Sequence, residues 1–249
     1  MARIMVILSL IGIPGIIMSC ASYAPAMPKL PKYKVHRLAQ TMPIDGNWDK
    51  PQWRDVEAVG IGNHMGERPK HRPRTQAKAL YDDRYVYVIF RVEDRYVRAV
   101  AQEYHGPVWK DSCVEFFFRP GDDLSLGYFN LEVNCGGTAL FHYQKVPREN
   151  VRIVDMADMQ QIEIAHSMPR IVEPEIIRPT IWTIEYRIPL AVLEKYCKVA
   201  QPRRGVIWRA NFYKCADETS HPHWLTWSAV DNPTPDFHLP QFFGILEFM

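Results

Sequence analysis

The chain has 249 residues, of which 47% are hydrophobic, and 30 Lys and Arg residues nearly balance 28 Asp and Glu residues, leaving a formal net charge of +2. Balanced charge without a long basic run argues against nucleic acid as a partner. Seven Trp, twelve Tyr and eleven Phe residues are enough to build a sizeable core. The length beyond the N-terminal segment fits one large domain or two small ones.

The N-terminal segment has the pattern of an export signal. Residues 1–19 contain one basic residue, Arg3, and an apolar stretch over 4–18 that glycine and proline interrupt. This stretch is too short for a membrane span, which needs about 20 apolar residues. We therefore interpret residues 1–19 as a signal peptide.

Cys20 follows the apolar stretch directly, and the run 17–20 (Ile-Met-Ser-Cys) resembles a bacterial lipoprotein cleavage site. In that interpretation Cys20 carries a lipid, and the protein is exported and lipid-anchored to a bacterial membrane, in the periplasm or at the cell surface. The alternative is an ordinary signal peptide that ends near a cysteine. Residues 20–40 contain several prolines and no apolar period, which predicts a Pro-rich spacer behind the anchor.

The remaining residues, 41–249, show no second linker and no internal repeat, so we expect one domain. Alternating residues over 85–92 and 182–188 predict strands, because side chains in a strand point to two faces in turn. Pro189 followed by 190–196 predicts one short helix, whereas 145–170 lacks a period and is typical of a loop. Many short strands between turns rich in Gly, Asp and Pro predict an all-β fold, an antiparallel β-sandwich with one short helix.

Two strand-like runs, 112–119 and 128–134, are joined by a turn rich in Gly and Asp and organise the rest of the chain. In each run apolar residues share one face and polar residues dominate the other. Residues 207–214 repeat the alternation, so this third run would extend the same polar surface. The residues that we expect on the surface are Trp109, Glu115, Glu132, Asn134, Arg209 and Asn211.

This surface has two interpretations. The first is a solvated sheet face, with Trp109 packed on its own loop. The second is a platform for a sugar, because an aromatic ring stacks on the apolar face of a sugar while carboxylate and amide groups hydrogen-bond its hydroxyls. In either case Arg209 would help to keep two nearby carboxylates ionised.

The run 108–120 (VWKDSCVEFFFRP), followed by 128–134 (YFNLEVN), resembles the central motif of the family 9 carbohydrate-binding modules and their stand-alone bacterial relatives. Further similarities occur in the family's order over most of the chain. They lie at 44–46 with Trp53, at 80–94 (LYDDRYVYVIFRVED), at 180–193 (TIWTIEYRIPLAVL) and at 237–248 (FHLPQFFGILEF).

The resemblance implies a jelly-roll-like sandwich that binds carbohydrate without cleaving it and supports the use of polysaccharides, beside a separate glycoside hydrolase. It also implies that Trp109 and Phe237, in the loop 231–240, form an aromatic clamp around the sugar. Two departures weaken the match, since Glu132 stands where the best-known member has a basic sugar contact and Phe237 stands where it has Trp. The alternative for Phe237 is a hydrophobic plug under the last loop.

Other functions remain open at this point. Glu115 and Glu132 could form the carboxylate pair of a glycoside-cleaving enzyme, which needs two carboxyls on either side of the scissile bond. Related DOMON-type β-sandwich domains bind haem through Met or His, although no haem-attachment motif occurs here. A purely structural surface protein would bind no ligand at all.

No cofactor is required by any of these motifs, but the resemblance implies structural calcium on loop carboxylates, for which Asp94, Asp122 and Asp123 are candidates. Two histidines near each other, His221 and His223, are more typical of a surface turn than of a metal site. Four cysteines besides Cys20 allow three disulfide connectivities, or free buried thiols. Strand alternation puts the first two on opposite faces, so we do not pair them; the four are Cys113, Cys135, Cys197 and Cys215.

Overall fold

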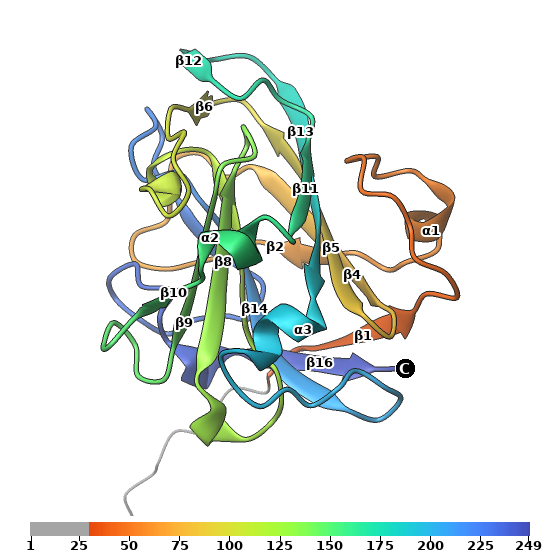
Figure 1. The fold of residues 1–249 in the computed structure, drawn as a ribbon. Helices are drawn as coiled ribbons and strands as arrows, with labels where there is room; N and C mark the ends of the chain where they lie inside the picture. Colours follow the sequence, from red (N-terminus) through yellow and green to blue (C-terminus); the bar gives the residue numbers. More distant parts are fainter. Residues whose placement is uncertain (1–29) are drawn as a thin grey trace, which may run out of the picture.

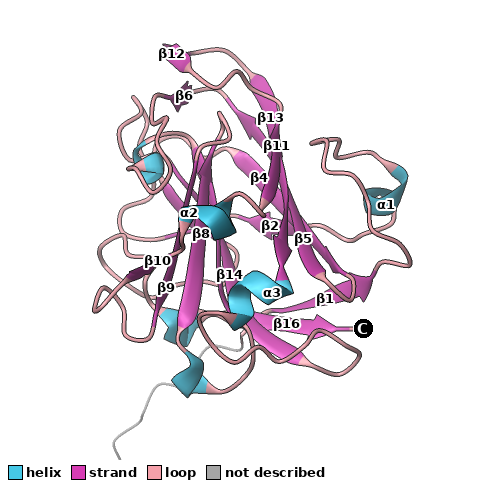
Figure 2. Cartoon of the chain, in the orientation of Figure 1, coloured by secondary structure: helices cyan, strands magenta, loops and turns pink. Residues whose placement is uncertain are grey.

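A computed structural model describes residues 30–249. The predicted signal peptide, the lipid-anchor residue Cys20 and the first part of the predicted spacer lie outside the described residues. Strands dominate the described chain and the helices are short (Figure 2). Among these residues, no helix is long and apolar enough to cross a membrane.

The strands form two facing sheets that share the strand β1 (Lys32–Arg37). In the first sheet the order is β10, β9, β8, β7, β14, β16 and β1, and two short strands extend it beside β14. The strands of the first sheet, besides β1, are β3 (Asn63–His64), β7 (Cys113–Arg119), β8 (Tyr128–Asn134), β9 (Ala139–Gln144), β10 (Arg152–Ile153), β14 (Ile207–Cys215), β15 (Trp224–Thr226) and β16 (Gly244–Phe248).

The second sheet continues from β1 in the order β4, β5, β13 and β11, with β2 paired to β4. Apart from the two parallel pairings of β1, the pairings in both sheets of the described chain are antiparallel. The strands of the second sheet, besides β1, are β2 (Val59–Ile61), β4 (Arg74–Tyr81), β5 (Tyr85–Asp94), β11 (Glu163–His166) and β13 (Thr180–Pro189). The strands β6 (Val97–Ala99) and β12 (Val172–Ile176) form a separate two-stranded sheet.

The short helices lie at the ends of strands and in the connecting loops (Figure 1). The predicted helix after Pro189 is α3, which begins at Leu190 as expected and ends at Glu194. The segment 145–170, expected to be a loop, contains β10, a single-turn helix and β11. The helical elements are α1 (Pro51–Arg54), η1 (Val108–Lys110), η2 (Leu124–Leu126), α2 (Met156–Met159), α3 (Leu190–Glu194) and η3 (Pro240–Phe242).

The main core lies between the two sheets and follows from strand alternation. Phe90 of the second sheet meets Phe212 of the first with ring centroids 5.9 Å apart, and Phe116 stacks on Phe212 at 5.0 Å. All three side chains are fully buried. Burying a phenylalanine side chain stabilises a fold by roughly 1.5–3 kcal/mol, so these rings hold the sheets together. The predicted all-β sandwich is confirmed.

The predicted spacer, 20–40, needs a correction. Its last part forms β1, which pairs in parallel with β16 through Lys32 and Ile245 and then with β4 through His36 and Leu80 (Figure 1). Tyr33 and Val35 alternate into the core from this strand. Two inward apolar side chains next to several prolines are too weak a signal to reveal a strand that is stabilised by partners distant in the sequence.

The outer face of the first sheet carries a second, smaller apolar layer. Phe117, Tyr128 and Tyr213 form its centre, and Phe243 covers it from the end of the chain. Loops from both ends of the sheet fold over this face, so the surface predicted to be polar and open is partly enclosed.

Candidate functional site

A cavity of about 590 Å³ opens on the outer face of the first sheet. Its floor consists of side chains from β7, β8 and β9, and its walls come from η1, from the loop after β9 and from the loop 231–240. This volume falls in the range of ligand pockets, about 300–1,000 Å³. Of the residues predicted from the sequence, the cavity brings together Trp109, Glu115, Glu132 and Phe237.

Trp109 stands at the wall of the cavity in η1 with 37% of its surface exposed. Its backbone is tied to the end of β14, because its carbonyl accepts a hydrogen bond from the Asp217 N–H at 3.2 Å and lies 3.4 Å from the Cys215 sulfur. These bonds hold an exposed aromatic ring at a fixed place beside the cavity. An exposed ring over a polar floor is the arrangement that a stacked sugar requires.

Glu115 and Glu132 lie directly opposite each other on β7 and β8, and both are almost fully buried. Glu115 accepts the Cys215 thiol at 3.0 Å through one oxygen, while its other oxygen, Oε2, is buried without a partner among the described residues. Burial raises the pKa of Glu115 well above its ordinary value, and Cys215 and Glu132 add to this shift. The floor thus holds a carboxyl that is open to a ligand.

Glu132 is the second carboxyl of the floor, and amide side chains support it. Burial raises the pKa of Glu132 to about 7, against the opposing effect of a hydrogen bond from Asn130. Asn130 donates to Glu132 at 2.9 Å and accepts from Gln144 at 2.9 Å. The three side chains form a connected row that can both donate and accept hydrogen bonds.

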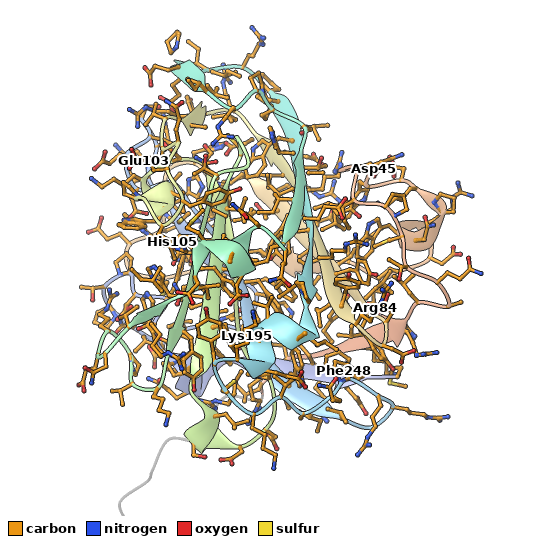
Figure 3. All side chains as sticks on the ribbon, viewed as in Figure 1. Asp45, Arg84, Glu103, His105, Lys195 and Phe248 are labelled. Atoms are coloured by element: carbon orange, nitrogen blue, oxygen red, sulfur yellow. The ribbon has the colours of Figure 1, made fainter. Side chains whose placement is uncertain are left out.

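Three histidines complete the far side of the cavity. His142 on β9 stacks on His105 with centroids 5.5 Å apart, and Figure 3 shows His105 on the side of the molecule where β8 and β9 lie, opposite Asp45. His238 receives a hydrogen bond of 2.7 Å at Nδ1 from Tyr128, or donates it. Burial lowers the pKa of both His142 and His238 to about 4, so both rings are neutral at pH 7.

Phe237 lines the cavity but is only 8% exposed. Its ring stacks on Tyr213 with centroids 4.1 Å apart and meets Phe117 edge-on at 6.3 Å. The Tyr213 hydroxyl donates to the Phe237 carbonyl at 3.2 Å. These contacts are those of a plug that anchors the loop 231–240, and they leave one edge of the ring toward the cavity.

Three predicted residues do not line the cavity. Asn134 is buried under the loop before η1, where its amide donates to Ala101 and to Asp111. Asn211 is bound on both sides to the Ser228 backbone, with its amide donating at 2.9 Å and its oxygen accepting at 2.8 Å. Arg209 pairs with Asp122 at 2.8 Å, so it does not neutralise Glu115 and Glu132 as expected.

Several residues that line the cavity were not predicted from the sequence. His142 and Gln144 belong to β9, and the alternation over 139–144 (ALFHYQ) would have placed both on one face. Asp217 follows β14 immediately, where burial raises its pKa to about 6 despite a hydrogen bond from Trp224. Arg148 comes from the irregular loop after β9 and pairs with Asp236, so no local pattern indicates it.

The three aspartates expected near calcium do not come together. Asp94, at the end of β5, is buried and accepts from His71 at 2.7 Å. Asp122 pairs with Arg209, and Asp123 accepts from the Ser125 N–H at 2.9 Å. Within residues 30–249, none of the three belongs to a cluster of three closely spaced His, Cys, Asp or Glu ligand atoms.

All four cysteines of the described chain are free. Cys113, Cys135 and Cys215 are buried, and Cys197 is half-buried. Cys113 lies in the outer apolar layer and Cys135 in the main core, which agrees with their predicted placement on opposite faces. Cys113 and Cys215 are directly opposite each other on β7 and β14.

Comparisons with known proteins identify solved structures with a similar fold. A chain from Bacteroides uniformis ATCC 8492, provisionally assigned as a carbohydrate-binding protein, is 27% identical, with a TM-score of 0.79 over 89% of this chain and 100% of that chain. A family 9 carbohydrate-binding module from Caldicellulosiruptor kristjanssonii in complex with cellotriose is 16% identical, with a TM-score of 0.61 over 88% of this chain and 93% of that one. The glucose complex of the same kind of module gives the same identity and TM-score and is covered to 96%.

The comparison with curated proteins gave no match. The sequence profile described as carbohydrate-binding family 9, in contrast, matches residues 50–248, well over half of the chain. The expected resemblance is therefore confirmed, and the chain belongs to carbohydrate-binding family 9.

Proposed function

We propose that this protein binds a carbohydrate in the cavity without cleaving it. The apolar face of one sugar unit stacks on Trp109, and its hydroxyls exchange hydrogen bonds with the row formed by Glu132, Asn130 and Gln144. The observation that carries the proposal is the exposed Trp109 ring held rigidly beside a buried, polar floor. Family membership supports it, because related modules are recorded in complex with cellotriose and glucose.

The experiment is calorimetric titration of the protein with mono- and oligosaccharides, beginning with glucose and cello-oligosaccharides. Trp109→Ala should weaken binding by at least about 30-fold, since a buried aromatic anchor contributes about 2 kcal/mol or more. The matched control is Trp48→Ala, because Trp48 is also a partly exposed tryptophan but packs against Lys78 on the second sheet. The control should bind sugar like the unaltered protein.

Two outcomes would contradict the proposal. The first is a folded protein that binds no member of a broad sugar panel. The second is equal loss of affinity in the two tryptophan variants, which would mean that the effect of Trp109→Ala is not local. Circular dichroism of both variants tells a lost ligand contact from a lost fold.

Glycoside cleavage is the second candidate, and one observation favours it. Glu115 and Glu132 lie side by side on the neighbouring strands β7 and β8. Burial raises the pKa of both carboxyls, as it does for the general acid of a glycosidase. Prolonged incubation with a bound oligosaccharide, followed by product analysis, separates the two functions. Release of shorter sugars that stops in Glu115→Gln would establish cleavage, whereas bound and intact sugar supports binding alone.

The proposal extends to where the protein acts. Residues 1–20 support export and attachment of a lipid at Cys20, and a lipid anchor would hold the cavity near a bacterial membrane. There the protein would hold polysaccharide fragments for a neighbouring glycoside hydrolase. Metabolic labelling with a fatty acid, compared between the unaltered protein and Cys20→Ala, tests the anchor.

A further inference from the structure

Two thiols and a carboxyl meet at the floor of the cavity. Cys113 and Cys215 occupy opposite positions on the neighbouring strands β7 and β14. Glu115 lies two residues after Cys113 on the same strand, and side chains two residues apart in a strand share a face. All three side chains are at most 2% exposed. Two neighbouring strands thus fix three potential metal ligands at one point.

The spacing of the ligand atoms is close to what a tetrahedral cation requires. The two sulfur atoms and one carboxylate oxygen all lie within 4.8 Å of one another, and Cys215 Sγ is 3.0 Å from Glu115 Oε1. Zn–S bonds of about 2.3 Å and a Zn–O bond of about 2.0 Å place tetrahedral ligands about 3.5 to 3.8 Å apart. Small side-chain rotations would therefore be enough to surround an ion, without movement of the strands.

A second observation points to a missing ligand at the same place. Glu115 Oε2 is buried and has no hydrogen-bond partner among residues 30–249. An orphaned buried carboxyl oxygen is costly, by about 1–3 kcal/mol, unless a bound group compensates for it. Glu115 and Cys215 both line the cavity, so solvent ions can reach the cluster from that side.

We infer that Cys113, Cys215 and Glu115 bind one thiolate-preferring divalent cation, of which Zn²⁺ is the representative. The two sulfurs and one Glu115 oxygen supply three ligands, and a water molecule from the cavity supplies the fourth. Binding releases to solvent the protons of both thiols and any proton that the Glu115 carboxyl carries, and no redox change takes place. The site is independent of the sugar proposal, although it would put a positive charge beneath the same cavity.

The charges around the cluster are compatible with a cation. Lys110 pairs with Glu218 at 2.6 Å, so its charge is already balanced. Lys214 points to the opposite face of β14, where its Nζ hydrogen-bonds His223 at 2.8 Å. Asp217 and Glu132, which line the same cavity, are acidic. Arg148, which lines the cavity, pairs with Asp236 at 2.7 Å, so its charge is balanced as well.

The test uses full-length protein that has been reduced with a phosphine and freed of metal with a chelator. Co²⁺ is titrated first, because a thiolate-bound Co²⁺ gives an intense charge-transfer absorption. We expect the band to saturate at about one equivalent and to vanish when about one equivalent of Zn²⁺ is added. Zn²⁺ should also raise the melting temperature of the unaltered protein.

Variants assign the ligands. Cys215→Ser and Cys113→Ser should each abolish most of the charge-transfer band, and Glu115→Gln should weaken Co²⁺ binding while it preserves the thiolate absorption. The matched control is Cys197→Ser, because Cys197 is a free cysteine outside the cluster. This control should behave like the unaltered protein, and circular dichroism should confirm that each variant is folded.

Several results would overturn the inference. The first is the absence of a thiolate band at saturating Co²⁺ in folded, fully reduced protein, which needs no variant. The second is a band that persists in Cys215→Ser and disappears in Cys197→Ser. Free-thiol titration of protein purified without reductant gives a third, since a quantitative Cys113–Cys215 disulfide would show that the pair closes on itself instead of on a metal.

Discussion

At the scale of single residues, Glu185 is the best example of a side chain that joins distant parts of the chain. It is fully buried on β13 and accepts hydrogen bonds from the Asp45 and Gly46 N–H groups at 2.9 and 2.8 Å. Its other oxygen meets Lys50 at 2.6 Å and the Trp53 indole at 2.7 Å. One carboxylate therefore attaches the segment before α1 to the second sheet.

Replacing the Glu185 carboxylate should destabilise the fold strongly. We expect Glu185→Gln to lower the free energy of unfolding by about 3 kcal/mol, because Lys50 loses its buried countercharge and keeps only the half-exposed Asp45, 3.0 Å away. Urea denaturation measures the effect. The control is Glu163→Gln, since Glu163 pairs with Arg187 at 2.6 Å but its side chain is 45% exposed, and an exposed pair contributes about 0–1 kcal/mol. Similar losses in the two variants would contradict the assigned role of Glu185.

A second residue-level prediction separates two buried asparagines of the first sheet, Asn130 and Asn211. Asn130→Ala should weaken sugar binding about tenfold, equivalent to about 1.4 kcal/mol, because it breaks the hydrogen-bonded row of the cavity floor. Asn211→Ala should destabilise the fold by about 1–3 kcal/mol, since it leaves the Ser228 backbone without a partner, and should leave sugar affinity unchanged. Calorimetry and thermal unfolding of both variants check this, and equal affinity losses would show that the cavity is wrongly delimited.

Asn134 and Asn211 show what strand alternation can predict. Alternation correctly placed Glu115 and Glu132 on one face, and it placed Asn134 and Asn211 there as well. It could not tell which part of that face stays open, because loops that are distant in the sequence cover Asn134 and hold Asn211. Trp109 was predictable through its resemblance to the family motif, whereas Arg148 depends on an irregular loop that has no recognisable period.

At the scale of elements, β9 places a titratable histidine, His142, in the cavity. His142 is partly buried, its Nε2 has no partner in the described chain, and burial lowers its pKa to about 4 from an ordinary value near 6.5. In the unfolded chain the ring gains a proton as the pH falls below about 6.5, while the folded ring stays neutral until about pH 4. The stabilising effect of the neutral ring is thus complete above pH 6.5 and declines as the pH falls toward 4.

We therefore expect His142→Gln to reduce acid sensitivity. Between pH 6.5 and 4 the change in the free energy of unfolding should be about 2 kcal/mol less destabilising in the variant than in the unaltered protein, since one titrating group is gone. The raised pKa values of Glu132 and Asp217 act in the opposite direction in both proteins, so the difference between the two profiles is the quantity to compare. Chemical denaturation at half-unit pH steps measures both profiles. His238 also contributes to the loss, so the variant keeps part of the slope. Superimposable profiles would mean that His142 does not titrate in this way.

Other elements illustrate where sequence patterns end. The strands β5 and β13 were predicted from their alternation, and the helix α3 was predicted from Pro189. Both signals are local in the sequence. The strand β10 has two residues, too few to display a period, and the six residues of β1 carry only two inward apolar side chains next to prolines. Both exist because a neighbouring strand offers hydrogen bonds, which is a property of the tertiary structure.

At the scale of the whole molecule, two sheets enclose the main core, and the first sheet carries the cavity on its other side. Strand alternation together with the family resemblance was sufficient to predict this sandwich. The enclosure of the cavity was not predictable, because it depends on η1 and on the loop 231–240, which Phe237 fastens to Tyr213. A rigid sheet below and anchored loops above leave a binding site that is formed before any ligand arrives.

The parallel pairing of β1 with β16 has a consequence for biosynthesis. Lys32 and its partner Ile245 are far apart in the sequence, so β1 keeps an unpaired edge until β16 has been synthesised. Strand edges are prone to pair with other chains, and a nascent chain arrested before β16 would be a substrate for chaperones or proteases. Synthesis of β16 therefore removes this exposed edge, since β16 closes the join between the two sheets.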